Sequence, residues 1–124
     1  MSERLALLIW AATPEHPELA VTPLVHALAA RALDAEVEIH FAGPAVRWLV
    51  DGVADSAFPT PAKEKSIGDF LREVHAAEVR LYACGMARAA WIEPGETLLP
   101  AAGHAGATAF VGRALDPDWR TLVF

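Results

Sequence analysis

The sequence has 124 residues, of which 54% are hydrophobic and 21% are charged. This length suits one domain over residues 1–124, and the high hydrophobic content excludes an intrinsically disordered chain. Ten basic and sixteen acidic residues give a formal net charge of −6. That balance argues against nucleic acid or an anionic membrane as a partner held by a broad positive field.

The apolar runs of the sequence are short. Each falls below the roughly 20 residues that a membrane-spanning helix requires, so we expect no membrane span. The run over residues 5–12 resembles the apolar core of a signal peptide, but prolines follow it at once and we interpret it as a buried strand. Cys84 is the only cysteine, so no internal disulfide can form and a cytoplasmic location is expected.

Strand and helix patterns alternate through the first half of the chain. Residues 4–10 (RLALLIW) are nearly all apolar, which is typical of a strand buried on both faces. An apolar stripe over residues 24–34 predicts a helix. Residues 36–42 (EVEIHFA) alternate polar and apolar side chains, which predicts a strand with one less buried face, near an edge of the sheet. A second helix is predicted over residues 43–53, with a proline in its first turn.

The central part of the chain contains one long loop and a further strand between two helices. Residues 55–65 carry prolines and charges and predict a loop. Ser66 has the character of a helix N-cap, with Asp69 in the favourable first turn. Residues 79–83 (VRLYA) predict a strand, and residues 84–90 predict a helix that follows it directly.

The last part of the chain predicts one helix and one strand. Residues 98–103 are ambiguous because they are rich in proline and alanine, whereas residues 104–116 show an apolar helical face and residues 119–124 predict a terminal strand. The alternation of strands with helices indicates βαβ units, hence a mostly parallel sheet with helices on both faces. We therefore expect a single α/β domain.

Cys84 is the sharpest candidate for chemistry. Ligands bind beyond the carboxyl ends of the strands in an open parallel sheet, and Cys84 lies at such an end, where a helix begins. The free N–H groups and partial positive charge of a helix start favour the thiolate over the thiol. Arg88 lies one helical turn later and adds positive charge. The alternative is that Cys84 is a small buried hydrophobic side chain, the commonest fate of a free cysteine.

The remaining polar residues give weaker signals. None of the five histidines has the spacing of metal ligands, so we expect no metal site. His40 and His104 fall near predicted carboxyl-end loops and could orient a thiolate, although a polar loop position or a partly buried position is the plainer interpretation. Trp91 could wall a pocket or a subunit contact. Glycine-rich phosphate loops and serine-nucleophile motifs do not occur, so we expect no cofactor.

The order of segments resembles the DsrE/DsrF-like family, which includes the sulfur-relay proteins DsrE and TusD. Four stretches carry the likeness: RLALLIW, EVEIHFAGPAVRWLVDGV, SIGDFLREVHAAEVRLYACGMARAA and GHAGATAFVGRALDPDWRTLVF. In the family, the third stretch contains a helix, a strand and then a cysteine that opens the next helix, and that cysteine is Cys84 here. The segment around residues 98–103 departs from the family, which usually has a clear strand there.

The resemblance implies a flavodoxin-like three-layer α/β/α sandwich that assembles with copies of itself or with related subunits. It also implies a sulfur carrier, a possible sulfurtransferase, that accepts sulfane sulfur as a persulfide on Cys84 and exchanges it with donor and acceptor proteins. The alternative is a non-catalytic oligomeric or regulatory subunit in which Cys84 is merely packed. A small-ligand or nucleotide-binding module is a third possibility, but it would need phosphate donors that the sequence lacks.

Overall fold

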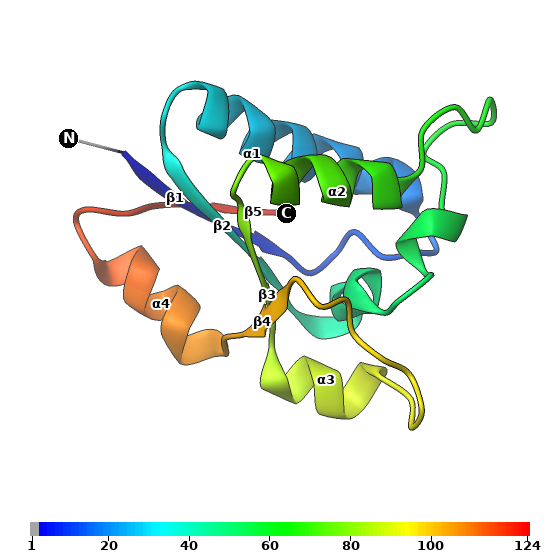
Figure 1. Ribbon diagram of the computed structural model, residues 1–124. Helices are drawn as coiled ribbons and strands as arrows, with labels where there is room; N and C mark the ends of the chain where they lie inside the picture. Colours follow the sequence, from blue (N-terminus) through cyan, green and yellow to red (C-terminus); the bar gives the residue numbers. More distant parts are fainter. Residues whose placement is uncertain (1–2) are drawn as a thin grey trace.

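A five-stranded parallel sheet forms the centre of the molecule (Figure 1). The computed structural model describes residues 3–124. The strands are β1 (Arg4–Ile9), β2 (Glu36–Phe41), β3 (Arg80–Ala83), β4 (Ala102–His104) and β5 (Arg120–Val123). Their order in the sheet is β4-β3-β2-β1-β5, and every neighbouring pair is parallel. The prediction of a parallel α/β fold is therefore confirmed.

Helices cover both faces of this sheet and form the outer layers of a three-layer sandwich. The four α-helices are α1 (Val21–Ala32), α2 (Ile67–Ala76), α3 (Gly85–Trp91) and α4 (Ala107–Leu115). The 3-10 segment η1 (Pro17–Leu19) lies between β1 and α1, and η2 (Gly43–Leu49) and η3 (Ala54–Ser56) lie between β2 and α2. In Figure 1, α1 and α2 lie side by side over one face, α4 lies across the opposite face, and α3 lies beyond the carboxyl ends of β3 and β4.

The core fills the face that α1 and α2 cover. Alternate residues of each strand point into it, so that Leu7 and Ile9 on β1 meet Ile39 and Phe41 on β2, and all four are at most 1% exposed. The start of α2 is fixed by the predicted N-cap. Ser66 and Asp69 exchange backbone-to-side-chain hydrogen bonds of 3.0 Å in both directions, a capping box that holds the first turn.

The prediction of an edge position for β2 is wrong. β2 lies between β1 and β3, and two of the three polar residues of its alternating pattern are as buried as the apolar ones: Glu38 is 0% exposed and His40 is 3% exposed, whereas Glu36 at the start of the strand is partly exposed. The physical reason is that Arg113 of α4 reaches Glu38 and compensates its charge. The polar positions therefore mark a covered face that is lined by charges rather than a face open to solvent.

The predicted helix over residues 43–53 is also wrong in its second half. The chain forms only the 3-10 segment η2, and Val50 then pairs with Leu98 in an isolated antiparallel bridge. Asp51 N donates to Thr97 O at 2.8 Å beside this bridge. Pairing with residues 97–98 satisfies backbone groups of residues 50–51 that a continued helix would otherwise satisfy. The helical periodicity of the sequence therefore does not lead to a helix here.

The ambiguous segment at residues 98–103 ends in a strand, β4, and the last predicted helix begins later than residue 104. His104 belongs to β4 and pairs with Ala83 of β3, and Ala105 N then donates to Ala83 O at 3.2 Å. Sheet pairing through residue 105 delays the start of α4 to Ala107.

None of the helices within residues 3–124 has the length and the apolar character that crossing a membrane would require.

Candidate functional site

Cys84 is the N-cap residue of α3 and directly follows β3. Its backbone is held on both sides: Cys84 N donates to Phe41 O of β2 at 3.0 Å, and Arg88 N donates to Cys84 O at 2.9 Å. The side chain packs against the margin of the core but stays partly exposed. Sheet and helix hydrogen bonds therefore fix the position of Cys84, and the residue as a whole remains partly exposed.

The end of β4 lies beside Cys84. Because His104 pairs with Ala83 and Ala105 N donates to Ala83 O, the turn from β4 into α4 sits next to the end of β3. Gly106, the N-cap of α4, is exposed and brings no side chain to this turn. The neighbourhood of the thiol is therefore built from the α3 start and from small residues of the β4–α4 turn (Figure 1).

Arg88 of α3 contacts His104 across this neighbourhood. Arg88 Nη1 lies 3.0 Å from His104 Nδ1 and 3.4 Å from His104 Nε2. An arginine can only donate, so His104 accepts through an unprotonated nitrogen. The sequence placed Arg88 one turn after Cys84 and left the role of His104 open. The structure places both on neighbouring elements and in contact with one another.

His40 lies in a different group of side chains from Arg88 and His104. It belongs to a buried group beneath α4, which the sequence analysis missed. Arg113 Nε donates to Glu38 Oε1 at 2.6 Å, and His40 Nε2 lies 3.3 Å from the same oxygen. The His40 ring contacts Tyr82 of β3 in a tilted arrangement and Phe110 of α4 in an edge-to-face arrangement, each at a centroid distance of 5.3 Å. Glu38 Oε2 and both ring nitrogens of His40 make no hydrogen bond within the described residues.

The charge of Glu38 is maintained in this buried place by its neighbours. Burial by itself raises the pKa of the carboxyl, but the contacts with His40 and Arg113 outweigh burial and hold the pKa of Glu38 below its usual value. Arg113 also stacks over Trp119, 4.5 Å from the ring centroid. A sequence signal for this group existed in Glu38 and His40, two of the three polar positions of EVEIHF, which share the face that α4 covers.

Trp91 walls a small cavity, one of the two roles considered for it from the sequence. The cavity measures about 280 Å³ and lies between the loop after β1 and η2, with Thr13, Pro14 and Arg47 among its lining residues. Arg47 forms a two-pronged ion pair with Glu96, with both distances at 2.9 Å, and donates to Trp91 O. The hydrogen bonds from Arg47 lower the pKa of Glu96 to about 2. This ion pair fixes the turn after α3 against η2.

Metal-ligating side chains do not gather in threes anywhere in residues 3–124. The chemistry that this part of the chain offers beyond β3 therefore consists of a thiol, a guanidinium group and an imidazole.

Comparison with solved structures agrees with the architecture. The crystal structure of the ychN protein from E. coli superposes with a TM-score of 0.76, the alignment covers all of both chains, and 17% of the residues are identical. At this identity the likeness shows the shared fold. A search of curated proteins finds no match.

Comparison with family models identifies the family. The model of the DsrE/DsrF-like family matches residues 6–124, which includes every strand except the first two residues of β1. The strand, cysteine and helix order at β3, Cys84 and α3 lies within the matched region. The chain belongs to the DsrE/DsrF-like family.

Proposed function

We propose that the protein is a sulfur carrier, which accepts sulfane sulfur as a persulfide on Cys84 and passes it to a thiol of a partner protein. The family to which the chain belongs generally serves in sulfur relay. The observation that carries the proposal is the position of Cys84, a partly exposed thiol at the point where β3 ends and α3 begins. It is also the only thiol of the sequence.

The transfer is balanced without any cofactor. The Cys84 thiolate attacks the outer sulfur of a donor persulfide, an S–S bond forms to Cys84, and the donor's S–S bond breaks to release the donor thiolate. An acceptor thiolate then attacks the outer sulfur on Cys84 and releases the Cys84 thiolate. Each step exchanges one sulfur–sulfur bond for another, so no net oxidation occurs. Because the chain has no second cysteine, the sulfur leaves to another protein.

Arg88 has a supporting electrostatic role in this proposal. It lies one helical turn after Cys84, so its positive charge can attract the anionic sulfur of a loaded persulfide. The contact with His104 restrains the long Arg88 side chain over the turn that follows β4. His104 is therefore a positioning residue, which acts on the sulfur through Arg88.

The alternative function is a non-catalytic oligomeric or regulatory subunit. The packing of Cys84 against the margin of the core is the observation that favours it. The two functions differ in thiol reactivity: a carrier thiol alkylates quickly near neutral pH, whereas a packed thiol does not.

Sulfur loading is the direct test. The protein is incubated with polysulfide or with a persulfide-loaded donor protein, and its intact mass is measured before and after a reducing agent. We expect one added sulfur atom that the reductant removes. Cys84→Ser is the matched control, and it should keep the fold and gain no sulfur. An absence of loading on the wild-type protein, or equal loading on the serine variant, would contradict the proposal.

Alkylation rates test the roles of Arg88 and His104. Arg88→Ala should slow alkylation of Cys84 near neutral pH about twofold, the effect of one screened charge, and Arg88→Lys should retain most of the rate. His104→Phe should reproduce part of the Arg88→Ala effect in the wild-type background and add nothing in the Arg88→Ala background. Additive effects of the two substitutions would show that His104 does not act through Arg88.

The proposed partners are donor and acceptor proteins of sulfur relay, together with further copies of this chain or related subunits. Exposed apolar side chains on one side of the molecule support an assembly: Val111, Leu115 and Val123 are 50%, 79% and 57% exposed on α4 and β5. A single cysteine without a disulfide partner fits a reducing compartment, and we propose the cytoplasm.

A further inference from the structure

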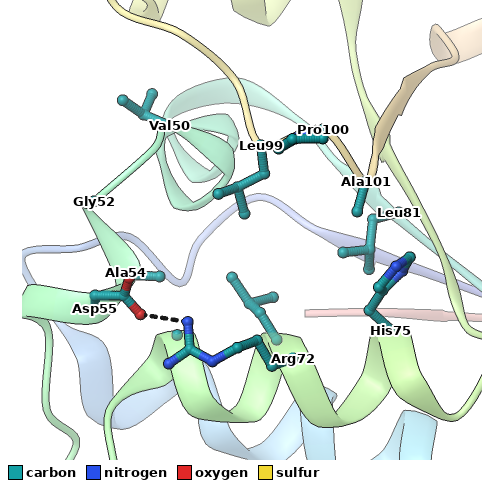
Figure 2. Close-up of a pocket in the computed structure, with 12 residues that line it drawn as sticks. Val50, Gly52, Ala54, Asp55, Arg72, His75, Leu81, Leu99, Pro100 and Ala101 are labelled. Carbon is teal, nitrogen blue, oxygen red and sulfur yellow. Dashed lines mark hydrogen bonds and ion pairs between the residues drawn. The ribbon is translucent and has the colours of Figure 1, made fainter.

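A cavity of about 310 Å³ lies apart from the Cys84 neighbourhood, between α2 and the segment that leads into β4 (Figure 2). It exists because the connection from β3 to β4 carries only the short helix α3, which lies beyond the carboxyl ends of the strands. The connection then returns through the bridge residue Leu98 and a turn at residues 100–101, which faces α2 across the cavity. Neither Cys84, Arg88 nor His104 lines this space.

The interior of the cavity is apolar. Leu71 of α2 and Leu81 of β3 line it and are each 3% exposed, and the half-buried side chain of Leu99 points into the space in Figure 2. Water in such a space finds few hydrogen-bond partners, so its replacement by apolar atoms is favourable.

The charges at the rim are already paired. Asp55 Oδ1 accepts a hydrogen bond from Arg72 Nη1 at 2.8 Å, the contact dashed in Figure 2, and Arg72 Nη2 donates to Asp69 Oδ1 at 2.7 Å. These contacts raise the pKa of Arg72 and lower that of Asp69. A charged ligand would therefore have to compete with existing ion pairs. At the other end, the His75 ring rises from α2 toward Ala101 and offers a nitrogen for one hydrogen bond.

One wall of the cavity is tied to the body of the protein by backbone hydrogen bonds. Leu99 N donates to Leu49 O, and Asp51 N donates to Thr97 O, both at 2.8 Å. These bonds hold the segment before β4 against the end of η2, so this wall cannot simply move inward to fill the space.

The opposite wall is fixed by a close approach at Gly68. A Cβ atom at this position would lie 1.9 Å from Asp55 Oδ1, so only glycine allows Asp55 to sit against α2. Ile67 N also donates to Ala57 O at 2.8 Å and ties the start of α2 to the segment after η3. Both walls are thus held in place without a ligand, and binding requires little ordering of the chain.

We propose that this cavity is a binding site for a small neutral molecule, mainly apolar, with one hydrogen-bonding group for His75. A space of this volume corresponds to about ten waters at about 30 Å³ each, and it lies at the lower end of the size range of small-molecule sites. A molecule of about ten non-hydrogen atoms, such as a fused aromatic ring, matches it. The proposal does not depend on sulfur transfer at Cys84.

Indole is a suitable probe because it is neutral, has nine non-hydrogen atoms and carries one N–H group. We expect indole to cause saturable shifts in the amide NMR spectrum of the full chain, concentrated at Leu71, His75, Leu81 and Leu99. Indole-3-carboxylate, which adds a negative charge to the same ring, should bind at least tenfold more weakly. An absence of saturable shifts, shifts centred on α4 or β5, or tighter binding of the carboxylate would each overturn the proposal.

A cavity-filling variant provides a second test. Ala101→Phe puts a ring into the space opposite His75 and should abolish the saturable shifts. Ala29→Phe adds the same ring to an exposed position of α1 and should leave them unchanged. Retention of wild-type binding by Ala101→Phe would overturn the site. The amide spectrum of Ala101→Phe shows whether this variant folds. If it does not fold, the residues whose amide signals shift in the wild-type protein decide whether indole binds in this cavity.

Discussion

The two faces of the sheet are covered in different ways. On β2, the side chains of Ile39 and Phe41 meet α1 and α2 in an apolar core, whereas Glu38 and His40 on the same strand face α4. All four residues are at most 3% exposed. However, α4 itself contributes no buried residue to its contact with the sheet. Both faces of β2 are therefore equally buried, but α1 and α2 contribute buried side chains to the contact and α4 contributes none.

This difference separates stability from specificity. Burial of one large apolar side chain stabilises a fold by about 1.5–3 kcal/mol. A buried ion pair regains in attraction roughly what its groups lose in hydration, so its net contribution is small, but breaking it is costly. The α1 and α2 face therefore supplies most of the stability. The Arg113–Glu38 pair specifies where α4 lies.

The largest expected effect is on the apolar face. Phe41→Ala removes a side chain that is 1% exposed and should lower the free energy of unfolding by about 3–5 kcal/mol, as measured by urea denaturation. Phe110→Ala is the matched control on α4, where the ring is only partly buried, and it should cost less than half as much. Equal losses would show that both faces contribute the same stability.

The next effect concerns the ion pair. Arg113→Ala leaves the carboxylate of Glu38 buried without its strongest partner and should cost about 1–3 kcal/mol, less than for a fully buried pair because the Arg113 side chain is 38% exposed. Amide exchange should accelerate in α4 and remain unchanged in α2. The double variant Glu38→Leu with Arg113→Leu should recover most of the loss. A double variant as unstable as Arg113→Ala would contradict this account.

A smaller effect appears in the dependence of stability on pH. The pKa of Glu38 is lower in the folded protein than its ordinary value of 4.5, so its pairing stabilises the fold above pH 4.5 and this contribution is lost as the pH falls through the lowered pKa. Glu38→Gln should therefore lose less stability than the wild type below pH 4.5. Glu96 and Asp69, whose pKa values are also lowered, affect both proteins equally. If the free energy of unfolding depends on pH in the same way in both proteins, Glu38 does not contribute to the loss of stability at low pH.

The smallest effect on stability is expected on the outer surface of α4. Leu115→Lys changes a residue that is 79% exposed and should alter the free energy of unfolding by less than about 0.5 kcal/mol. If α4 is part of an assembly interface, light scattering should show a multiple of 13.3 kDa for the wild type and a lower mass for this variant. Leu33→Lys, at the C-cap of α1, is the exposed control. A wild-type mass near 13.3 kDa would exclude the oligomer.

Local features could be predicted from the sequence wherever neighbouring residues determine the outcome. The apolar run of β1, the capping box at Ser66 and the position of Cys84 between strand and helix are of this kind. The burial of the polar face of β2 was missed because Glu38 is paired with Arg113, which lies 75 residues later in the chain. In the same way, η2 was expected to continue as a helix because nothing near Val50 announces its bridge to Leu98.

The candidate site shows the same limit. Cys84 and Arg88 were predicted from a single helical turn, whereas the contact of Arg88 with His104 requires the register of β4 on β3. The cavity beside α2 left no pattern in the sequence because its lining comes from four separate segments.

The strand order has a consequence for the folding process. Leu7 of β1 pairs with Ile39 on one side and with Leu122 on the other, so β1 gains its first neighbour from a nearby segment and its second from a distant one. Closing the longer loop costs more chain entropy and slows the later step. Until β5 arrives, one edge of β1 is unpaired and open to association with other chains. The hydrogen bonds from Trp10 N and Ala11 N to Phe124 O then continue the pairing of the two segments beyond the carboxyl end of β5.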